Sequence, residues 1–424
     1  MKKIVIILSF FLLMMGCDHK DDKNTKLHNE NTNISVTEDE YKDLTKEIGE
    51  EILNGNPEVI KGKLSSNVLN QVGEDELIQS IKSILGSESL LEMENISVEE
   101  KDGLVATVFQ GKMTTTTGYL TITYNTNKEI EGIFYNAKPR TQPSSKEDEK
   151  NIKIGDKEPL DGILKIGNQG ESSPLVLLIP GSGPQDMDET IFDNKPLKDI
   201  ADGLAENGIS SIRYHKRTYV YPEKFMNEGT IEDEYLKDME WILEHRKDFT
   251  KGEDIYLLGH SQGGMIIPAM AERHPDIKGL IIMAGSPRKF IDIMYDQLME
   301  STPKNDQEKV EALYKSLKNQ EDNPMVPVSY LKSLDQVEGE QFLKKLDLPI
   351  LILQGEEDFQ VKADKDFKLY KDILKEKENV TFILYPKLNH LFMESNGKKS
   401  MDEYKEKGKV SQEVIDDIVS FIQK

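Results

Sequence analysis

The spacing of apolar and polar residues divides the chain into two parts with different patterns. In the second part, from about residue 151, short apolar runs recur with helical stretches between them, at 175–179, 210–214, 255–258, 280–283, 350–353 and 380–384. Runs of this length without alternation are typical of strands buried on both faces, and their alternation with helices indicates a mainly parallel sheet. We therefore predict an α/β domain over residues 151–424.

The first part, residues 38–137, has helical patterns followed by strand-like ones. Apolar residues recur at helical spacing from Tyr41 to Ile52 and from Leu77 to Leu85, and apolar runs follow at 104–109, 119–124 and 130–135. Helices followed by neighbouring strands predict a small α+β domain. Residues 138–150 contain prolines, serines and a run of charges, and we interpret them as a linker.

The N-terminus has the pattern of an export signal. Two lysines precede an almost uninterrupted apolar run at 4–15, which ends in Gly16-Cys17. The run is too short to span a membrane as a helix and has the length of a signal-peptide core. Its end resembles the lipobox of bacterial lipoproteins, which implies lipidation of Cys17 and an extracytoplasmic protein anchored at the bacterial cell membrane. An ordinary secretory signal is the alternative. Residues 18–37 are polar and predict a disordered tether.

Charge and cysteine content exclude several classes of function. The 54 Lys and Arg residues against 77 Asp and Glu residues give a formal net charge of −23. A chain this acidic is not expected to bind nucleic acid or to dock electrostatically on anionic lipid, so membrane contact is expected through the lipid anchor only. Cys17 is the single cysteine, which excludes an intrachain disulfide and a thiolate zinc cluster.

A candidate nucleophile lies in the segment Gly259-His260-Ser261-Gln262-Gly263. This segment follows a predicted strand and opens a predicted helix. A sharp strand-to-helix turn would expose Ser261 at the end of the sheet, and it requires small residues at the two glycine positions. The sequence therefore predicts Ser261 as the attacking hydroxyl.

A candidate acid and a candidate base follow later strands. Asp358 lies just past the run 350–353, and His390 lies in the loop after 380–384. A carboxylate in that place can orient the imidazole, which can then act as general base. Glu356 and Glu357 are alternatives for the acid, and so is Asp292 after the preceding strand, although Asp292 falls in a predicted helix.

The loop after the run 175–179 is the candidate oxyanion-binding segment. It reads Pro180-Gly181-Ser182-Gly183, and the backbone N–H groups of Ser182 and Gln262 are the predicted donors. A glycine-rich turn with Ser182 as a helix cap is the alternative. The acidic residues that follow, at 186, 188 and 189, are interpreted as hydrogen-bonding loop residues rather than metal ligands.

The order Ser261, Asp358, His390 resembles that of the α/β-hydrolases, over nearly all of residues 150–424. The segments 181–189 and 213–217 resemble bacterial esterases related to the serine aminopeptidase group. The resemblance implies an α/β-hydrolase fold with a helical cap at about 286–345, and a serine hydrolase that cleaves small-molecule carboxylic esters without cofactor or metal. The first domain resembles a small bacterial domain of unknown function that precedes hydrolase domains.

Two other functions fit the same residues. A peptidase or amidase would act on small peptides with the same three side chains. A cell-surface binding protein could keep the hydrolase fold without turnover, although the complete set of candidate residues argues against it. The sequence predicts no particular oligomeric state.

Overall fold

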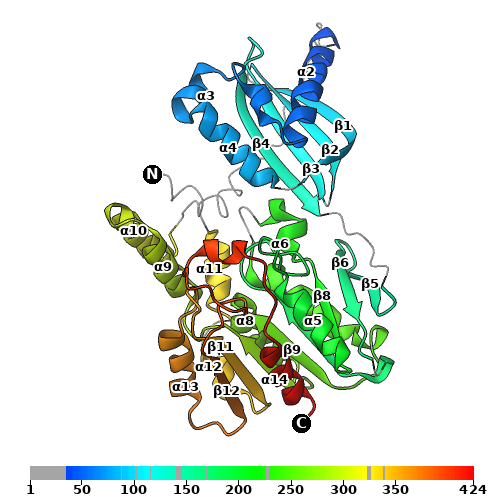
Figure 1. Cartoon of the computed structure of the whole chain (residues 1–424), viewed down its shortest axis with the longest axis vertical. Coiled ribbons are helices and arrows are strands. Elements are labelled where there is room, and N and C mark those ends of the chain that lie inside the picture. The colour runs from blue at the N-terminus through cyan, green and yellow to red at the C-terminus, as the bar shows by residue number, and fades with distance from the viewer. Residues whose placement is uncertain are drawn as a thin grey trace, which may run out of the picture. The chain divides into compact units, whose positions relative to one another are not determined.

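The computed structural model describes residues 35–86, 88–101, 103–114, 116–139, 146–168, 170–225, 229–321, 326–337 and 340–424. These residues form two compact units, with the division between Gln142 and Pro143 (Figure 1). The predicted signal peptide, Cys17 and most of the predicted tether lie outside the described residues. Among the helices that are described, none combines the length and the apolar character needed to cross a membrane.

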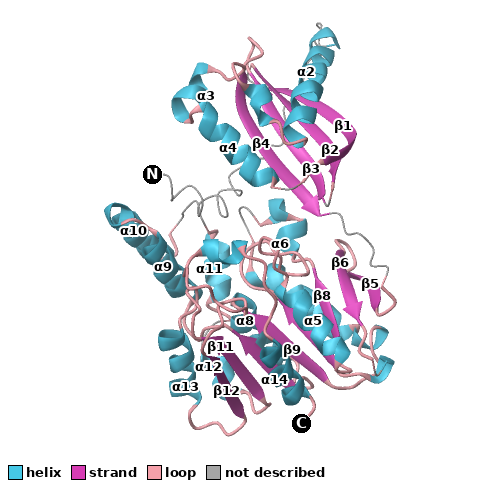
Figure 2. Ribbon diagram, viewed as in Figure 1, coloured by secondary structure: helices cyan, strands magenta, loops and turns pink. Residues whose placement is uncertain are grey.

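The first unit packs helices against a four-stranded antiparallel sheet (Figure 2). Its strands pair in chain order, and alternate residues of the two central strands are buried against α2 and α4, with Phe109 and Leu120 fully buried. The elements are α2 (Ser35–Leu53), η2 (Pro57–Ile60), α3 (Ser66–Gln71), α4 (Glu74–Leu85), β1 (Leu90–Lys101), β2 (Leu104–Met113), β3 (Thr116–Tyr124) and β4 (Ile130–Pro139).

The structure differs from the sequence prediction at the edges of this unit. Helix α2 begins at Ser35, inside the stretch 18–37 predicted as a tether. Strand β1 was not predicted, because it is an edge strand whose residues are mostly polar and exposed. Strand β4 continues to Pro139 and β5 begins at Glu149, so the predicted linker 138–150 contains strand residues at both ends.

The second unit is built on an eight-stranded, mainly parallel sheet with the order β12-β11-β10-β9-β7-β8-β6-β5. The six predicted strands are present and parallel, and an antiparallel hairpin, β5 and β6, extends the edge beside β8. The strands are β5 (Glu149–Ile154), β6 (Leu160–Lys165), β7 (Leu175–Ile179), β8 (Ser210–Tyr214), β9 (Ile255–His260), β10 (Gly279–Met283), β11 (Ile350–Gly355) and β12 (Val380–Tyr385).

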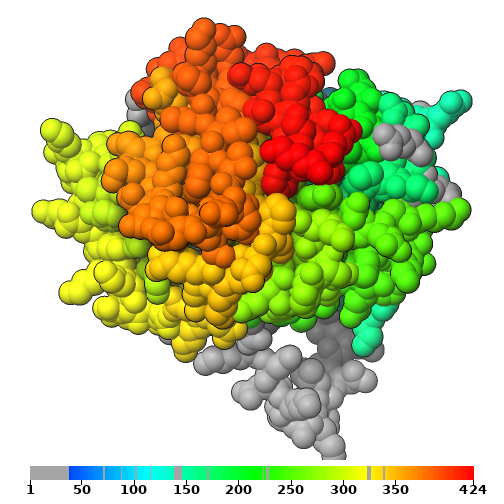
Figure 3. All heavy atoms as spheres, turned by 90° about the horizontal axis from the view of Figure 1, so that it is seen from below, coloured from blue at the N-terminus to red at the C-terminus, as the bar shows by residue number. Residues whose placement is uncertain are grey.

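Helices cover both faces of this sheet, as the apolar runs predict. In β7, Leu177 belongs to the core beneath α7 (Lys237–Glu244), α8 (Gln262–Arg273) and α13 (Lys368–Leu374), whereas Leu178 belongs to the core beneath α5 (Pro196–Glu206) and α14 (Gln412–Ile422). Figure 3 shows the C-terminal segment in red between orange and green segments of the surface. The sheet is therefore the middle of three layers.

The residues described between β10 and β11, where the sequence predicts a cap, form four α-helices and a 3₁₀-helix, η7 (Lys304–Asp306). The α-helices are α9 (Phe290–Ser301), α10 (Gln307–Lys318), α11 (Val328–Leu334) and α12 (Glu340–Lys345). Apolar residues of α9 and α10 face one another, among them Met294, Leu298 and Leu313. This insertion supplies side chains that reach the loops at the ends of the strands.

Candidate active site

Ser261 lies in the turn between β9 and α8 with a left-handed backbone. Its φ is 51° and its ψ is −120°, a conformation that residues with a side chain rarely adopt. The flanking glycines permit the turn, because a Cβ at Gly259 would lie 2.5 Å from the Gly263 carbonyl carbon, and one at Gly263 would lie 2.5 Å from the Ile179 oxygen. The strained turn thus depends on both glycines, and it presents Ser261 beyond the carboxyl end of β9.

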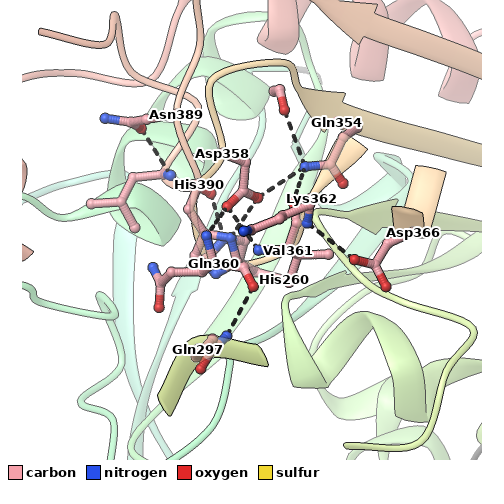
Figure 4. Close-up of polar contacts among 12 residues, drawn as sticks. His260, Gln297, Gln354, Asp358, Gln360, Val361, Lys362, Asp366, Asn389 and His390 are labelled. Atoms are coloured by element: carbon pink, nitrogen blue, oxygen red, sulfur yellow. Dashed lines mark hydrogen bonds and ion pairs between the residues drawn. The ribbon is translucent and has the colours of Figure 1, made fainter. Parts of the chain in front are cut away.

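Asp358 and His390 form a buried hydrogen-bonded pair (Figure 4). The Oδ2 atom of Asp358 lies 2.7 Å from Nδ1 of His390, and it also accepts a 2.9 Å hydrogen bond from Gln354 Nε2. The other carboxylate oxygen accepts the backbone N–H groups of Gln360 and Val361 at 2.8 and 2.9 Å. A carboxylate held in this way accepts a hydrogen bond from Nδ1–H of the imidazole, which leaves Nε2 free to accept a proton.

The loop of His390 approaches the acid closely because residue 355 is a glycine. A Cβ at Gly355 would lie 2.3 Å from the Leu388 oxygen and 2.7 Å from the Asn389 oxygen. The backbone of Gly355 is not among those with a positive φ. Close packing of two loops, and not turn geometry, therefore requires the glycine.

Asp292, the alternative acid, lies in α9 and is engaged elsewhere. Its Oδ1 accepts a 2.6 Å hydrogen bond from the hydroxyl of Tyr314 in α10. This contact ties two helices of the insertion together and raises the pKa of Tyr314 to about 12, chiefly through that hydrogen bond. The imidazole of His390 thus has its carboxylate partner in Asp358.

The segment after β7 passes directly beside Ser261. A Cβ at Gly181 would lie 2.9 Å from Oε1 of Glu189 and 3.1 Å from the Cβ of Ser261, so a larger residue there would crowd both side chains. Ser182 follows, and the next helix along the described stretch 170–225 begins at Pro196, which excludes Ser182 as a helix cap. Gln262 is the first residue of α8, so its N–H has no acceptor one turn earlier within the helix.

A buried pair, Glu189 and His260, connects the loop after β7 with the loop of His390. One carboxylate oxygen of Glu189 accepts the Gly181 N–H at 2.6 Å and lies 2.9 Å from His260 Nδ1. His260 Nε2 lies 2.9 Å from the backbone oxygen of His390. Burial lowers the pKa of His260, but the charge and hydrogen bond of Glu189 outweigh it, so the net shift is upward.

A second buried group lies on the other side of Gly181. The ammonium of Lys216 is 2.6 Å from a carboxylate oxygen of Glu234, and the phenol of Tyr235 is 2.7 Å from the same ammonium. Burial lowers the pKa of Lys216 despite the opposing effect of Glu234. Burial also raises the pKa of Tyr235 well above its usual value, which keeps the phenol protonated.

The acidic residues after Ser182 are used in hydrogen bonds and ion pairs of the loop. Asp186 accepts the N–H and hydroxyl of Thr190 at 2.8 and 2.6 Å, and Asp188 lies 2.8 Å from the guanidinium of Arg213. His215 accepts the Met187 N–H at 3.1 Å, and burial lowers its pKa. Among the described residues no group of acidic, histidine or cysteine side chains is arranged to hold a metal ion.

Sequence reasoning missed several polar residues around the site. Gln354 contacts Asp358 but belongs to no short motif. Glu189 is a hydrogen-bonding loop residue, as the sequence predicts, but its pairing with His260 was not anticipated. Lys216 lies in the segment 213–217, which the sequence singled out as esterase-like without assigning it a role. Tyr235 lies in η5 (Glu232–Leu236), a π-helix, and such turns are frequent at functional sites but hard to predict from sequence.

The fold and the arrangement of these loops define an α/β-hydrolase. The chain belongs to the same family as Esterase EstD of Thermotoga maritima. It is 32% identical to that protein over 409 residues, which cover 90% of this chain and 93% of the relative. The model of the prolyl oligopeptidase family matches residues 221–411.

Solved structures of low sequence identity also resemble the chain. Est1E from Butyrivibrio proteoclasticus has 18% identity and a TM-score of 0.44, covering 65% of this chain and 99% of that chain. The acylaminoacyl peptidase of Pyrococcus horikoshii has 14% identity and a TM-score of 0.46, covering 78% of this chain and 56% of that chain.

Proposed function

We propose that the protein is a serine hydrolase that cleaves carboxylic esters, with Ser261, His390 and Asp358 as its catalytic triad. The observation that carries the proposal is the buried 2.7 Å pair of Asp358 and His390, at the same end of the sheet as the strained turn of Ser261. The 32% identical relative is named an esterase, which supports ester hydrolysis as the activity.

Each of these residues has a role in an acyl-enzyme mechanism. The Oγ of Ser261 attacks the ester carbonyl while Nε2 of His390 accepts its proton, because Nδ1 is held by Asp358. The oxyanion forms between the N–H groups of Ser182 and Gln262. His390 then gives the proton to the leaving alcohol. A water molecule next attacks the acyl-enzyme while His390 accepts its proton, and His390 returns that proton to the Oγ of Ser261 as the carboxylic acid leaves.

A panel of substrates tests this proposal against its alternatives. Para-nitrophenyl esters of short and medium acyl chains should be hydrolysed with a kcat/KM well above that of aminoacyl para-nitroanilides. Faster cleavage of the anilides would establish a peptidase, which the match to the prolyl oligopeptidase family makes the second candidate. A folded protein without turnover on either panel would establish the binding-protein alternative.

We also propose that the protein is lipid-anchored outside the cytoplasm through Cys17. The support is the apolar run that ends in Gly16-Cys17 and resembles a lipobox. In a bacterial host, Cys17→Ser should leave the precursor unprocessed or release the protein from the membrane fraction. Unchanged membrane attachment together with an unchanged mature mass would refute the anchor.

A further inference from the structure

The peptide bond between Gly181 and Ser182 is held by polar side chains at its carbonyl end. The carbonyl oxygen of Gly181 accepts a 2.9 Å hydrogen bond from the ammonium of Lys216 and a 2.6 Å hydrogen bond from the hydroxyl of Tyr235. The N–H of Gly181 is held as well, by Glu189 at 2.6 Å. Both polar groups of this glycine therefore have fixed partners.

Peptide planarity passes this constraint on to Ser182. The C=O of one residue and the N–H of the next point in opposite directions across a trans peptide bond. Donors that fix the Gly181 oxygen therefore also fix the direction of the Ser182 N–H, away from Lys216 and Tyr235. The positive charge of Lys216 beside the carbonyl oxygen also polarises the peptide group, which strengthens the Ser182 N–H as a donor.

Stability alone does not account for this arrangement. Lys216 and Tyr235 are each 1% exposed and Glu234 is 3% exposed. A buried ion pair costs desolvation of both charges and often stabilises no more than apolar side chains would. The ammonium instead makes a charge-assisted contact with the backbone oxygen whose orientation sets the direction of the Ser182 N–H.

The same group of side chains reaches the second proposed oxyanion donor. The hydroxyl of Tyr235 lies 3.1 Å from Oε1 of Gln262, and Nε2 of Gln262 donates to the hydroxyl of Tyr330 at 3.2 Å. Tyr330, in α11 of the insertion, donates to the second oxygen of Glu234 at 2.6 Å. Tyr235 thus contacts both Gly181, which precedes one proposed donor, and Gln262, which is the other, and Lys216 contacts Gly181 and Tyr235.

We propose that Lys216 and Tyr235 are positioning residues of the oxyanion hole, which hold the Gly181 carbonyl so that the Ser182 N–H meets the developing oxyanion. The inference rests on the proposed function, because it assumes that Ser182 donates to the intermediate. Neither side chain touches the substrate; both act through the peptide that they orient.

Lys216→Met and Tyr235→Phe test this role. Each variant removes one of the two hydrogen bonds to the Gly181 oxygen and keeps a side chain of similar length. Loss of one oxyanion donor costs about 10²–10³-fold in kcat. We expect a loss in this range for Lys216→Met, a loss of about tenfold for Tyr235→Phe, and a KM within about threefold of the wild type for both.

Matched controls separate positioning from stability. Lys165→Met removes another buried lysine, in β6 of the edge hairpin, whose ammonium lies 2.7 Å from Asp148 and 3.1 Å from Asp202 of α5. Tyr256→Phe removes another hydroxyl that donates to a backbone oxygen, that of Ile422 at 3.2 Å. Both controls should lower the melting temperature as the test variants do, but their kcat should stay within about twofold of the wild type.

A trifluoromethyl ketone inhibitor gives a readout that a structural role would not change. It forms a hemiketal oxyanion on the serine, so its Ki should rise in each test variant by the same factor by which kcat/KM falls. A folded Lys216→Met and a folded Tyr235→Phe with kcat equal to the controls, or with only KM raised, would overturn the inference. If Lys216→Met does not fold, Tyr235→Phe decides, because it loses only a hydroxyl.

Ser261→Ala keeps this result distinct from the proposed function. If Ser261→Ala retains ester hydrolysis, the proposed function fails. If Ser261→Ala is inactive while the two test variants behave like their controls, only the positioning role fails.

Discussion

Replacing Asp358 by asparagine should change the tautomer of His390 while preserving the shape of the site. One oxygen of Asp358 accepts two backbone N–H groups at 2.8 and 2.9 Å, so the amide oxygen of the asparagine should take that place. The amide NH₂ then faces Nδ1 of His390, where the carboxylate oxygen lies at 2.7 Å in the native protein. A donor at that place forces Nδ1 to accept, and the proton moves to Nε2.

The size of the effect follows from the loss of the base. With the proton on Nε2, His390 cannot accept the proton of Ser261, and a change of this kind costs about 10⁴-fold in kcat, or about 5.5 kcal/mol in activation free energy. Steady-state hydrolysis of one para-nitrophenyl ester, with circular dichroism to confirm folding, measures it. Asp292→Asn is the matched control and should lose less than about tenfold, because its partner is Tyr314 in the insertion. The opposite ranking of the two variants would refute this assignment of the acid.

Three further predictions concern packing, pH and the domain boundary. Gly355→Ala places a methyl group 2.3 Å from the Leu388 oxygen, so it should lower the free energy of unfolding by about 1–3 kcal/mol and reduce kcat. Denaturant titration and ester hydrolysis measure the two effects, and unchanged values would contradict the close packing. Because the pKa of His260 is raised in the folded protein, its pair with Glu189 stabilises below about pH 6.5, and this stabilisation is lost as pH rises through the raised pKa. Glu189→Gln should therefore lower the melting temperature more at about pH 5.5 than at about pH 8.5, and the reverse order would contradict the pairing. A chain that begins at residue 146 should fold and hydrolyse a small ester. A chain that begins at 151 should have a lower melting temperature, because it lacks Glu149, which lies 3.3 Å from the buried guanidinium of Arg213. Equal melting temperatures would contradict this boundary.

The sequence predicts those features that depend on local pattern. Buried parallel strands leave uninterrupted apolar runs, and the six runs of the second part coincide with β7 to β12. The turn of Ser261 is predictable as well, because its backbone geometry restricts residues 259 and 263 to glycine. In both cases a physical constraint acts on residues that are neighbours in the chain.

Features that depend on contacts between distant segments left no such pattern. The mostly polar edge strand β1 and the hairpin of β5 and β6 take their structure from pairing with a neighbouring strand. The partners of Gly181 come from residues 189, 216 and 235, which only the folded topology brings together. The requirement for glycine at position 355 likewise comes from the approach of the His390 loop, which cannot be read from a single segment.

Covalent labelling identifies the nucleophile most directly. The purified protein is treated with a fluorophosphonate probe, digested, and examined by mass spectrometry, with Ser261→Ala as the control. We expect a single modified serine, Ser261, and we expect labelling and ester hydrolysis to be lost together in Ser261→Ala. Labelling of another serine, or ester hydrolysis that survives in Ser261→Ala, would contradict the assignment of Ser261 as the nucleophile.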